Sequence, residues 1–511
     1  MRYLLGIDIG TSGAKALLVN ADTAEIVASS VESYELSTPT PLWAEQSPGD
    51  WWQAVIASVS NVLNASKIDA AEIKGIGLSG QMHGSVFLDE NGSVLRPAIL
   101  WCDQRTQAEC DWIMDTVGRE RTIELTSNPI LTGFTAGKII WTRNHEPEVY
   151  SRVKKVLLPK DYIRFRLTGE FATEVSDASG TGLFDVKRRE WSWEMLDAIN
   201  IPSHWMPHSY ESVEISGKIS REAASLTGLA EGTPGVGGGG DQAAGAVGNG
   251  VVEDGIVSSA VGTSGVVFAF TDKPVVDPKL RLHTFCHAMP NKWHMMGVML
   301  SAGGSLRWYR DTFADTETVI AKALGVDPYD VICKEAAKAP AGSEGLIFLP
   351  YLTGERTPHP NPHARGVFFG ITLRSDRPHF MRAVLEGVAY GLRDSFTILD
   401  EMNIPISQIR ASGGGARSEI WRQIQADVTG KNHVTINVEE GPALGAALLA
   451  GVGTGIYPTV ADACRSIIKV TSQTNTNPAA KRIYDGFYPI YRSLYNSLVG
   501  QFDAVAALMD N

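Results

Sequence analysis

The sequence predicts an α/β protein with two lobes, each built on a sheet that helices cover. Three observations point to this fold class. The glycine-rich turn GTSG occurs twice, at Gly10–Gly13 and at Gly262–Gly265, and each copy stands between two short apolar runs. Each copy also opens one half of the 511-residue chain. After each copy, segments with helical spacing of apolar residues alternate with short β-rich runs, which is the pattern of α/β domains.

The first copy is predicted to join two strands of a hairpin. Tyr3–Asp8 is an apolar run that ends in an acid, and Ala14–Val19 is apolar again. The polar segment Asn20–Glu25 is predicted to turn the chain into a third short strand, Ile26–Ala28.

The second copy repeats this arrangement near the middle of the chain. Ile256–Val261 and Val266–Phe270 are the strands predicted on either side of it. Four matching letters alone can arise by chance, but the same letters between two strands at the start of each half indicate an internal repeat. The glycine run Gly237–Gly240 precedes this copy. We therefore place the lobe boundary near residue 250, which gives lobes 1–250 and 251–511.

Helices and buried strands are predicted at four further places. Asp50–Leu63 and Met381–Leu399 carry apolar residues at helical spacing. Ile73–Leu78 and Gly345–Leu349 are short apolar runs of the kind that form buried strands. This mixture favours sheets that are covered by helices.

Composition and charge argue against several classes of protein. The net charge is −12 and no block of basic residues occurs, whereas a nucleic-acid-binding protein usually presents a basic face. The five cysteines include no CxxC pair, which argues against a disulfide framework and favours a reducing compartment. No apolar run approaches the roughly 18–20 residues of a membrane span, and the N-terminal segment does not resemble a signal peptide. We expect a cytoplasmic protein without a membrane partner.

The two GTSG turns are candidate phosphate-binding sites. The backbone N–H groups of such a turn point into a concavity that suits phosphate oxygens, and glycine allows the positive φ that the turn needs. We expect nucleotide contacts from Thr11, Ser12 and Gly13, and from Gly262 and Thr263. For one copy alone an ordinary surface hairpin is an equal alternative, which the duplication weakens. No GxxxxGK[ST] motif occurs, so a P-loop nucleotidase is not expected.

Asp8 is a candidate metal ligand and catalytic residue. It lies at the carboxyl end of the first predicted strand, where α/β sheets tend to bind ligands. A carboxylate beside a phosphate is repelled unless a cation lies between them. Asp8 therefore predicts a Mg²⁺ site.

Two further glycine clusters could admit a nucleotide. Gly413–Gly415 comes just before Ser418, the predicted N-cap of a helix over Glu419–Val428, and a helix N-terminus suits phosphate. Gly303–Gly304 offers another point of close approach. For both clusters a purely structural role is the alternative. The nucleotide-binding candidates here are Gly303, Gly304, Gly414, Gly415 and Ser418.

Asp241 is the candidate catalytic base. It ends the run GGGGD and begins the small-residue segment QAAGAVG, so a helix cap is the structural alternative. Four preceding glycines are more than a cap requires, and they allow a substrate to approach the backbone closely. Because a helix N-terminus favours a negative charge, we expect Asp241 to be ionised at neutral pH and to be a weak base. Phosphoryl transfer tolerates a weak base, since positioning supplies most of the rate.

These segments resemble the FGGY family of carbohydrate kinases, relatives of hexokinase and actin. The similar segments are GIDIGTSGAKALLV, GGGGDQAAGAVG, VGTSG and SGGGARSEIWRQIQADV, together with two family signatures at Gly133–His145 and Gly366–Glu386. The resemblance runs from about Tyr3 to Gly453. It implies two actin-like (ribonuclease H-like) lobes with a nucleotide and sugar cleft between them. It also implies an ATP-dependent kinase that uses Mg²⁺, and homodimers by analogy.

Within the family, four segments are similar to the branch that phosphorylates the terminal hydroxyl of D-xylulose. They are Ser79–Gly84, Leu42–Trp52, Arg96–Arg105 and Leu158–Tyr162. The small-molecule partners are thus expected to be D-xylulose and ATP, and the product D-xylulose 5-phosphate. The sugar-pocket residues that this resemblance implies are Met82 and His83, and with less support Gln81, Asp103, Arg105 and Gln242; it also implies Asp241 as the base.

Some positions depart from the family pattern and leave alternatives open. Gln242 replaces a frequent Asn, Gly137 replaces a proline, and WNDGR has become WCDQR. L-Xylulose, D-ribulose and xylitol therefore remain alternative acceptors. A non-catalytic actin-like ATPase is a less favoured alternative, because such a protein needs no sugar pocket.

Three further groups are assigned structural roles. A zinc site is not favoured for the four His and Cys side chains between His283 and His294. Of Trp43, Trp51 and Trp52, at least two are expected to pack in a core or an interface rather than on a sugar. Glu386 lies on the apolar face of a predicted helix and is expected to be a buried acid with partners.

Overall fold

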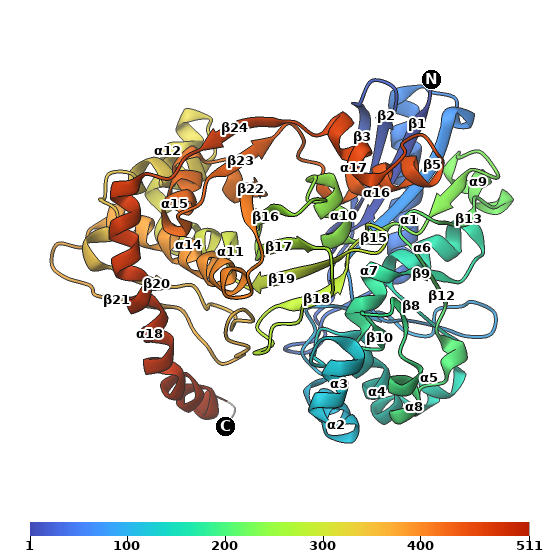
Figure 1. The fold of residues 1–511 in the computed structure, drawn as a ribbon, viewed down its shortest axis with the longest axis horizontal. Helices are drawn as coiled ribbons and strands as arrows, with labels where there is room; N and C mark the ends of the chain where they lie inside the picture. Colours follow the sequence, from blue (N-terminus) through green and yellow to red (C-terminus); the bar gives the residue numbers. More distant parts are fainter. Residues whose placement is uncertain (510–511) are drawn as a thin grey trace.

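Each half of the chain is built on a seven-stranded mixed sheet in the computed structural model, which describes residues 1–509 (Figure 1). The predicted α/β class with two lobes is confirmed. The first sheet has the order β13-β14-β5-β1-β2-β3, with β15 also paired to β5. Its strands are β1 (Tyr3–Ile9), β2 (Gly13–Asn20), β3 (Glu25–Ser33), β5 (Ile73–Gly80), β13 (Ile215–Lys218), β14 (Pro234–Val236) and β15 (Gly239–Gly240).

The second sheet has the order β18-β19-β17-β16-β22-β23-β24. Its strands are β16 (Gly255–Val261), β17 (Gly265–Thr271), β18 (His283–Cys286), β19 (Trp293–Met299), β22 (Ile406–Ser412), β23 (His433–Ile436) and β24 (Val470–Thr474). Five two-stranded sheets complete the β structure of residues 1–509. Their strands are β4 (Glu45–Gln46), β6 (Val86–Leu88), β7 (Ala98–Ile99), β8 (Lys155–Leu157), β9 (Ala172–Glu174), β10 (Phe184–Asp185), β11 (Glu190–Trp191), β12 (His208–Tyr210), β20 (Ile347–Leu349) and β21 (Val367–Phe369).

The internal repeat is visible in the strand pairing. β1 pairs antiparallel with β2 and parallel with β5, and β16 pairs in the same way with β17 and β22. Each GTSG sequence is therefore the turn of an antiparallel hairpin at the centre of its sheet, as predicted. The third predicted strand, Ile26–Ala28, lies in the N-terminal part of the longer edge strand β3.

Helices cover the sheets where the apolar spacing predicts them. The predicted Asp50–Leu63 helix is α1, which packs on β2 and β3, and the predicted Met381–Leu399 helix is α14, which packs on β17 and β19. The α-helices of the first half are α1 (Pro48–Ser66), α2 (Gln107–Val117), α3 (Arg119–Thr126), α4 (Thr135–His145), α5 (Pro147–Arg152), α6 (Pro159–Thr168), α7 (Val175–Ala178), α8 (Trp193–Ala198), α9 (Arg221–Thr227) and α10 (Asp241–Gly248). Those of the second half are α11 (Gly303–Phe313), α12 (Asp315–Leu324), α13 (Pro328–Ala336), α14 (Arg377–Glu401), α15 (Glu419–Thr429), α16 (Gly441–Gly453), α17 (Val460–Ile467) and α18 (Pro478–Met509).

One helix of the second half packs on the first sheet. α16 lies between the two sheets beside α10, and it contacts both β1 and β5 (Figure 1). A Cβ atom added to Gly6 would lie 1.9 Å from the Ala443 carbonyl oxygen, and one added to Gly77 would lie 1.8 Å from that of Ala446. The strand and helix backbones therefore touch directly. The division near residue 250 stays a prediction, since α16 crosses to the first sheet.

Two global expectations can be compared with the structure. All five cysteines are free thiols, which agrees with the absence of a disulfide framework. None of the helices within residues 1–509 combines the length and the apolar composition that a bilayer span requires.

Candidate active site

Two carboxylates from different elements meet at the end of the first sheet. Asp8, on β1, lies in register with Ser79 of β5, and β5 in turn pairs with Gly239–Gly240 of β15. α10 begins immediately after β15, so Asp241 is its first residue and Gly240 is its N-cap. Pairing through β5 therefore brings Asp241 close to Asp8, although 232 residues separate them in the sequence.

The expectation that Asp241 is ionised at neutral pH is wrong. Burial and the neighbouring charge of Asp8 raise the pKa of the Asp241 carboxyl to about 7, and these effects outweigh the hydrogen bonds from Gln242 that favour the charged form. The Gln242 Nε2 group donates to Asp241 Oδ1 over 3.3 Å. Asp241 is thus poised to gain and lose a proton near neutral pH, which suits a general base.

Asp8 fits a cation site. Its Oδ1 atom is buried and accepts no hydrogen bond from residues 1–509. Burial raises the pKa of Asp8, while the nearby Ser79 hydroxyl and the charge of Lys15 lower it to a smaller extent. A buried carboxylate oxygen without a partner is costly unless a charge compensates it. Mg²⁺ suits the site because it usually takes only one or two protein carboxylates, with water and phosphate oxygens as further ligands.

Met82 and His83, the predicted sugar contacts, lie beside the glycine loop that precedes Asp241. Met82 is buried against Gly240, where an added Cβ would lie 2.9 Å from Met82 Cγ. The His83 ring stacks on Phe134 at a centroid distance of 4.9 Å, and its Nδ1 atom lies 2.6 Å from the Gly180 carbonyl oxygen. These contacts fix both side chains beside the loop that carries Asp241.

The hydrogen bond of His83 determines its tautomer. Burial first, and the charge of Lys138 second, hold the pKa of His83 well below its usual value, so the ring is neutral. Because a carbonyl oxygen can only accept, Nδ1 carries the proton and donates to Gly180. The Nε2 atom is therefore an acceptor, suited to the hydroxyl group of a sugar.

Lys138 holds the backbone of His83, which adopts a left-handed φ of 67°. Its Nζ atom donates to the carbonyl oxygens of His83, over 2.7 Å, and Gly133, over 2.8 Å. The Thr135 hydroxyl donates to the same His83 carbonyl. We expect Lys138→Met to raise the KM for the acceptor about tenfold with a smaller change in kcat, because the buried carbonyls of His83 and Gly133 each lose the lysine as a donor.

Steady-state kinetics with the acceptor varied measures this effect. Arg143→Met is a matched control on the same helix, since Arg143 also donates to a backbone carbonyl, that of Ile199, over 2.9 Å. The control should leave KM unchanged. An unchanged KM in Lys138→Met would contradict the positioning role of this lysine.

The other predicted sugar residues have different surroundings. Gln81 connects the first hairpin with β4. Its side chain accepts a hydrogen bond from the Thr11 hydroxyl over 3.2 Å and donates one to Gln46. Asp103 and Arg105 form a buried ion pair at 2.7 Å. Both side chains are engaged by the protein, since Asp103 also accepts from the Ala44 amide and Arg105 stacks on Trp43. Their predicted role in the sugar pocket stays a prediction.

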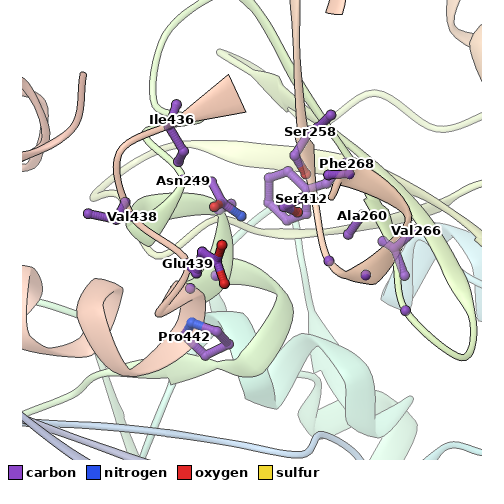
Figure 2. A pocket seen from close by; sticks show the side chains of 18 of the residues that line it. Asn249, Ser258, Ala260, Val266, Phe268, Ser412, Ile436, Val438, Glu439 and Pro442 are labelled. Carbon is purple, nitrogen blue, oxygen red and sulfur yellow. The ribbon is translucent and has the colours of Figure 1, made fainter. Parts of the chain in front are cut away.

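A cavity of about 650 Å³ extends from Asp241 into the second lobe. Figure 2 shows Ile436 and Val438 on one side of it and Ser258, Ser412 and Ala260 on the other. Of the predicted residues, the cavity brings together Asp241, Gln242, Gly262 and Gly414. The turn of the second hairpin, the glycine loop after β22 and Asp241 therefore border one space, large enough for a nucleotide.

The remaining nucleotide candidates are not among the residues that line this cavity. The amides of Gly303 and Gly304 donate to the carbonyls of Gly262 and Thr263, so they support the hairpin. Gly415 packs on Val261. The Ser418 hydroxyl accepts from the Trp421 amide, which confirms the predicted N-cap. Of the first hairpin, Ser12 is exposed and Thr11 and Gly13 are half-buried.

Comparison with known proteins identifies the family of this site. The model of the N-terminal domain of the FGGY family of carbohydrate kinases matches residues 3–248, and that of the C-terminal domain matches residues 257–454. The chain belongs to the FGGY family. It is therefore an ATP-dependent carbohydrate kinase.

Full-length relatives of this FGGY kinase include xylulose kinases and a gluconokinase. The xylulose kinase of Escherichia coli is 42% identical over 97% of this chain and 99% of its own length. The gluconokinase of Bacillus subtilis is 35% identical over 99% of this chain and 98% of its own length. A xylulose kinase structure from Rhodospirillum rubrum superposes with a TM-score of 0.90 at 30% identity, covering 98% of this chain and all of its own.

Several cavity residues of the FGGY kinase carry no recognisable sequence signal. Arg417 and Glu439 form an ion pair of 2.9 Å at the cavity, and Asn249 and Phe268 line its wall. They come from separate segments that only the fold brings together. Positions that vary together in an alignment of related sequences could have revealed these residues. The spacing of residues in one sequence could not.

The structural assignments are confirmed where the structure tests them. Within residues 1–509, no group of three or more His, Cys, Asp or Glu side chains is arranged to hold a metal ion. Trp51 and Trp52 are buried in the first core. Glu386 is buried and accepts from Arg382, over 2.7 Å, and from Tyr484.

Proposed function

We propose that this FGGY kinase transfers the γ-phosphoryl group of ATP to the terminal hydroxyl of D-xylulose, giving D-xylulose 5-phosphate. The observation that carries the proposal is the position of Asp241, between the cavity that borders the second hairpin and the pair Met82–His83. One carboxylate is thereby placed within reach of both a bound nucleotide and a sugar. The xylulose kinases among the relatives support the choice of sugar.

The chain supplies base catalysis and orientation. Asp241 accepts the proton of the attacking hydroxyl while the bond between that oxygen and phosphorus forms, and ADP leaves. The neutral His83 accepts a hydrogen bond from another sugar hydroxyl through Nε2, and Met82 contacts the carbon chain. Asp8, with Asp241 nearby, would hold Mg²⁺, which neutralises phosphate charge when bound. Holding the sugar hydroxyl against the phosphoryl group supplies much of the rate.

A panel of acceptors tests the proposal. D-Xylulose, L-xylulose, D-ribulose, xylitol, glycerol and D-gluconate should be compared by kcat/KM in a coupled assay of ADP release, and D-xylulose should lead. The gluconokinase relative makes the sugar acid a necessary member of the panel. Release of ADP at the same rate without any acceptor would instead support the non-catalytic ATPase.

The rate should also depend on pH through Asp241. Because the base must be deprotonated and its pKa is about 7, kcat/KM for D-xylulose should rise between pH 6 and 8 and fall about tenfold per pH unit below the pKa. The residual kcat/KM of Asp241→Asn should not rise in this way between pH 6 and 8. This comparison distinguishes ionisation of the aspartate from ionisation of ATP itself. A flat wild-type profile between pH 6 and 8 would contradict the assignment.

A further inference from the structure

One short segment, residues 174–181, contacts both the loop that carries Asp241 and the acceptor contact His83. It consists of the N-cap of α7, α7 itself and a 3₁₀ turn, and α7 lies beside β15 (Figure 1). The Ser176 hydroxyl accepts a hydrogen bond from the Gly240 amide over 3.1 Å. The Gly180 carbonyl accepts one from His83 Nδ1 over 2.6 Å. The segment therefore joins the two groups that must meet across the reacting hydroxyl.

The contact between this segment and the acceptor site is direct. A Cβ atom added to Gly180 would lie 2.4 Å from Cε1 of the His83 ring and 3.0 Å from the terminal methyl of Met82. The backbone of the segment thus packs against both predicted sugar contacts. Any movement of it relative to Asp241 would change the distance between the base and the sugar.

The orientation of the Ser176 hydroxyl is fixed by Glu174. The hydroxyl donates to Glu174 Oε1 over 3.0 Å, so its oxygen presents a lone pair to the Gly240 amide. Glu174 also accepts from the Ser176 amide over 2.6 Å and the Asp177 amide over 2.9 Å. Its other hydrogen bond comes from the Ser212 hydroxyl, over 3.1 Å. With donors on both of its oxygens, this carboxylate cannot turn away from Ser176.

A buried charge cluster holds Glu174 in turn. Lys160 Nζ lies 3.4 Å from Glu174 Oε1 and 3.1 Å from Asp177 Oδ2, and it donates to Asp161 Oδ1 over 2.7 Å. All four side chains are fully buried. Burial lowers the pKa of Lys160, but the three carboxyl groups outweigh burial and raise it above its usual value. Loss of one member would leave a buried charge uncompensated, so the cluster gives the segment a fixed position.

The start of the glycine loop is anchored by the same helix that carries Lys160. Arg164, on α6, donates to the carbonyl oxygens of Val236 and Gly237, each over 2.6 Å. The loop is thus held at its start by a buried guanidinium and at its end by the Ser176 hydroxyl. The contact at the end is the one adjacent to Asp241.

We propose that Ser176 is a positioning residue that fixes the Asp241 carboxyl group relative to the acceptor hydroxyl. This inference rests on the proposed function, since it takes Asp241 as the base and His83 as a sugar contact. Ser176 acts through Gly240 and exchanges no proton with the acceptor. Because the same segment holds the His83 ring, one hydrogen bond sets the separation of the base and the sugar, on which the rate of phosphoryl transfer depends.

Ser176→Ala in the full-length enzyme tests this role. We expect kcat for D-xylulose to fall about 10- to 30-fold, because the buried Gly240 amide loses its acceptor and the loop shifts. The KM for D-xylulose should change less than about twofold, since His83 keeps its bond to the Gly180 carbonyl. Initial rates with D-xylulose varied at saturating ATP separate the two constants.

Ser212→Ala is the matched control. It removes a hydroxyl that is also fully buried and donates to the same Glu174 carboxylate, but that makes no hydrogen bond to Gly240. The Ser212 carbonyl accepts from the Gly238 amide, and this backbone contact is kept in the variant. Both variants should lower Tm by similar amounts in thermal unfolding, whereas Ser212→Ala should keep kcat within about twofold of the wild type.

The failure of each claim can be distinguished. Equal losses of kcat in the two variants would overturn the inference, because the surroundings of Glu174 rather than the contact with Gly240 would then be responsible. An unchanged kcat in Ser176→Ala, with or without a raised KM, would overturn it too. Absence of D-xylulose activity in the wild type would overturn the proposed function alone. The same pair of variants, compared on the acceptor that the wild type phosphorylates fastest, would then still decide the role of Ser176.

Discussion

Asp241→Asn is expected to lower kcat for D-xylulose by about 10²- to 10⁴-fold, the range that general base catalysis contributes. The amide has the shape of the carboxyl group but cannot accept the hydroxyl proton. It also removes the repulsion from Asp8, so the folded structure should keep its stability or gain some. Initial rates with saturating D-xylulose and ATP measure the loss, and Asp241→Ala should behave similarly.

Measuring nucleotide binding by the Asp241→Asn variant distinguishes loss of the base from damage to the nucleotide site. Most of the cavity wall consists of backbone and side chains other than Asp241, so the Kd for ADP, measured by calorimetry, should change less than about threefold. Asp254→Asn, at an exposed acid near the start of β16, is the matched control and should keep full activity. If Asp241→Asn retained more than a tenth of the wild-type kcat, the base would have to be another group.

Gly238→Ala is expected to have the second largest effect, on stability as well as on activity. Gly238 has a φ of 71°, and a Cβ atom there would lie 1.9 Å from the Leu78 carbonyl oxygen on β5. A methyl group must push the loop away from the sheet, which should lower the free energy of unfolding by about 3 kcal/mol. The same shift displaces Asp241, and misplacement by about 1 Å can cost about 100-fold in kcat/KM.

Gly232→Ala provides the comparison for this loop. Gly232 has a similar φ of 84°, but no atom outside its neighbours lies within 4 Å of an added Cβ. It should lose only about 1 kcal/mol, the cost of an alanine at positive φ, and retain its activity. Thermal unfolding and kcat/KM measured on both variants decide the matter. Equal behaviour of the two would show that contact with β5 does not position the base.

The sequence predicts the parts of this enzyme whose signals are local. The two hairpins can be predicted because a glycine turn between two apolar runs is typical of a β-hairpin. Asp241 can be singled out because four glycines precede it. The protonation of Asp241 is not readable in this way. A helix N-terminus predicts a low pKa for Asp241. Burial and the charge of Asp8, which lies far away in the sequence, raise this pKa to about 7 instead.

Contacts between distant segments limit the rest of the prediction. Gly303 and Gly304 are correctly recognised as points of close approach, but which backbone they meet depends on the fold. Asp103 and Arg105 form an ion pair with each other, and the motif that contains them does not reveal this contact.

The seam between α16 and the first sheet has a consequence for biosynthesis. β1 carries Asp8, α10 carries Asp241, and both rest on α16, with the Gly445 and Ala244 backbones in direct contact. A nascent chain that has emerged only as far as β19 already contains both carboxylates. It still lacks the helix against which their elements pack. The ribosome must deliver some 150 further residues before the first sheet is covered on that face, so the order of translation delays the assembly of the Asp8–Asp241 pair until the last part of synthesis.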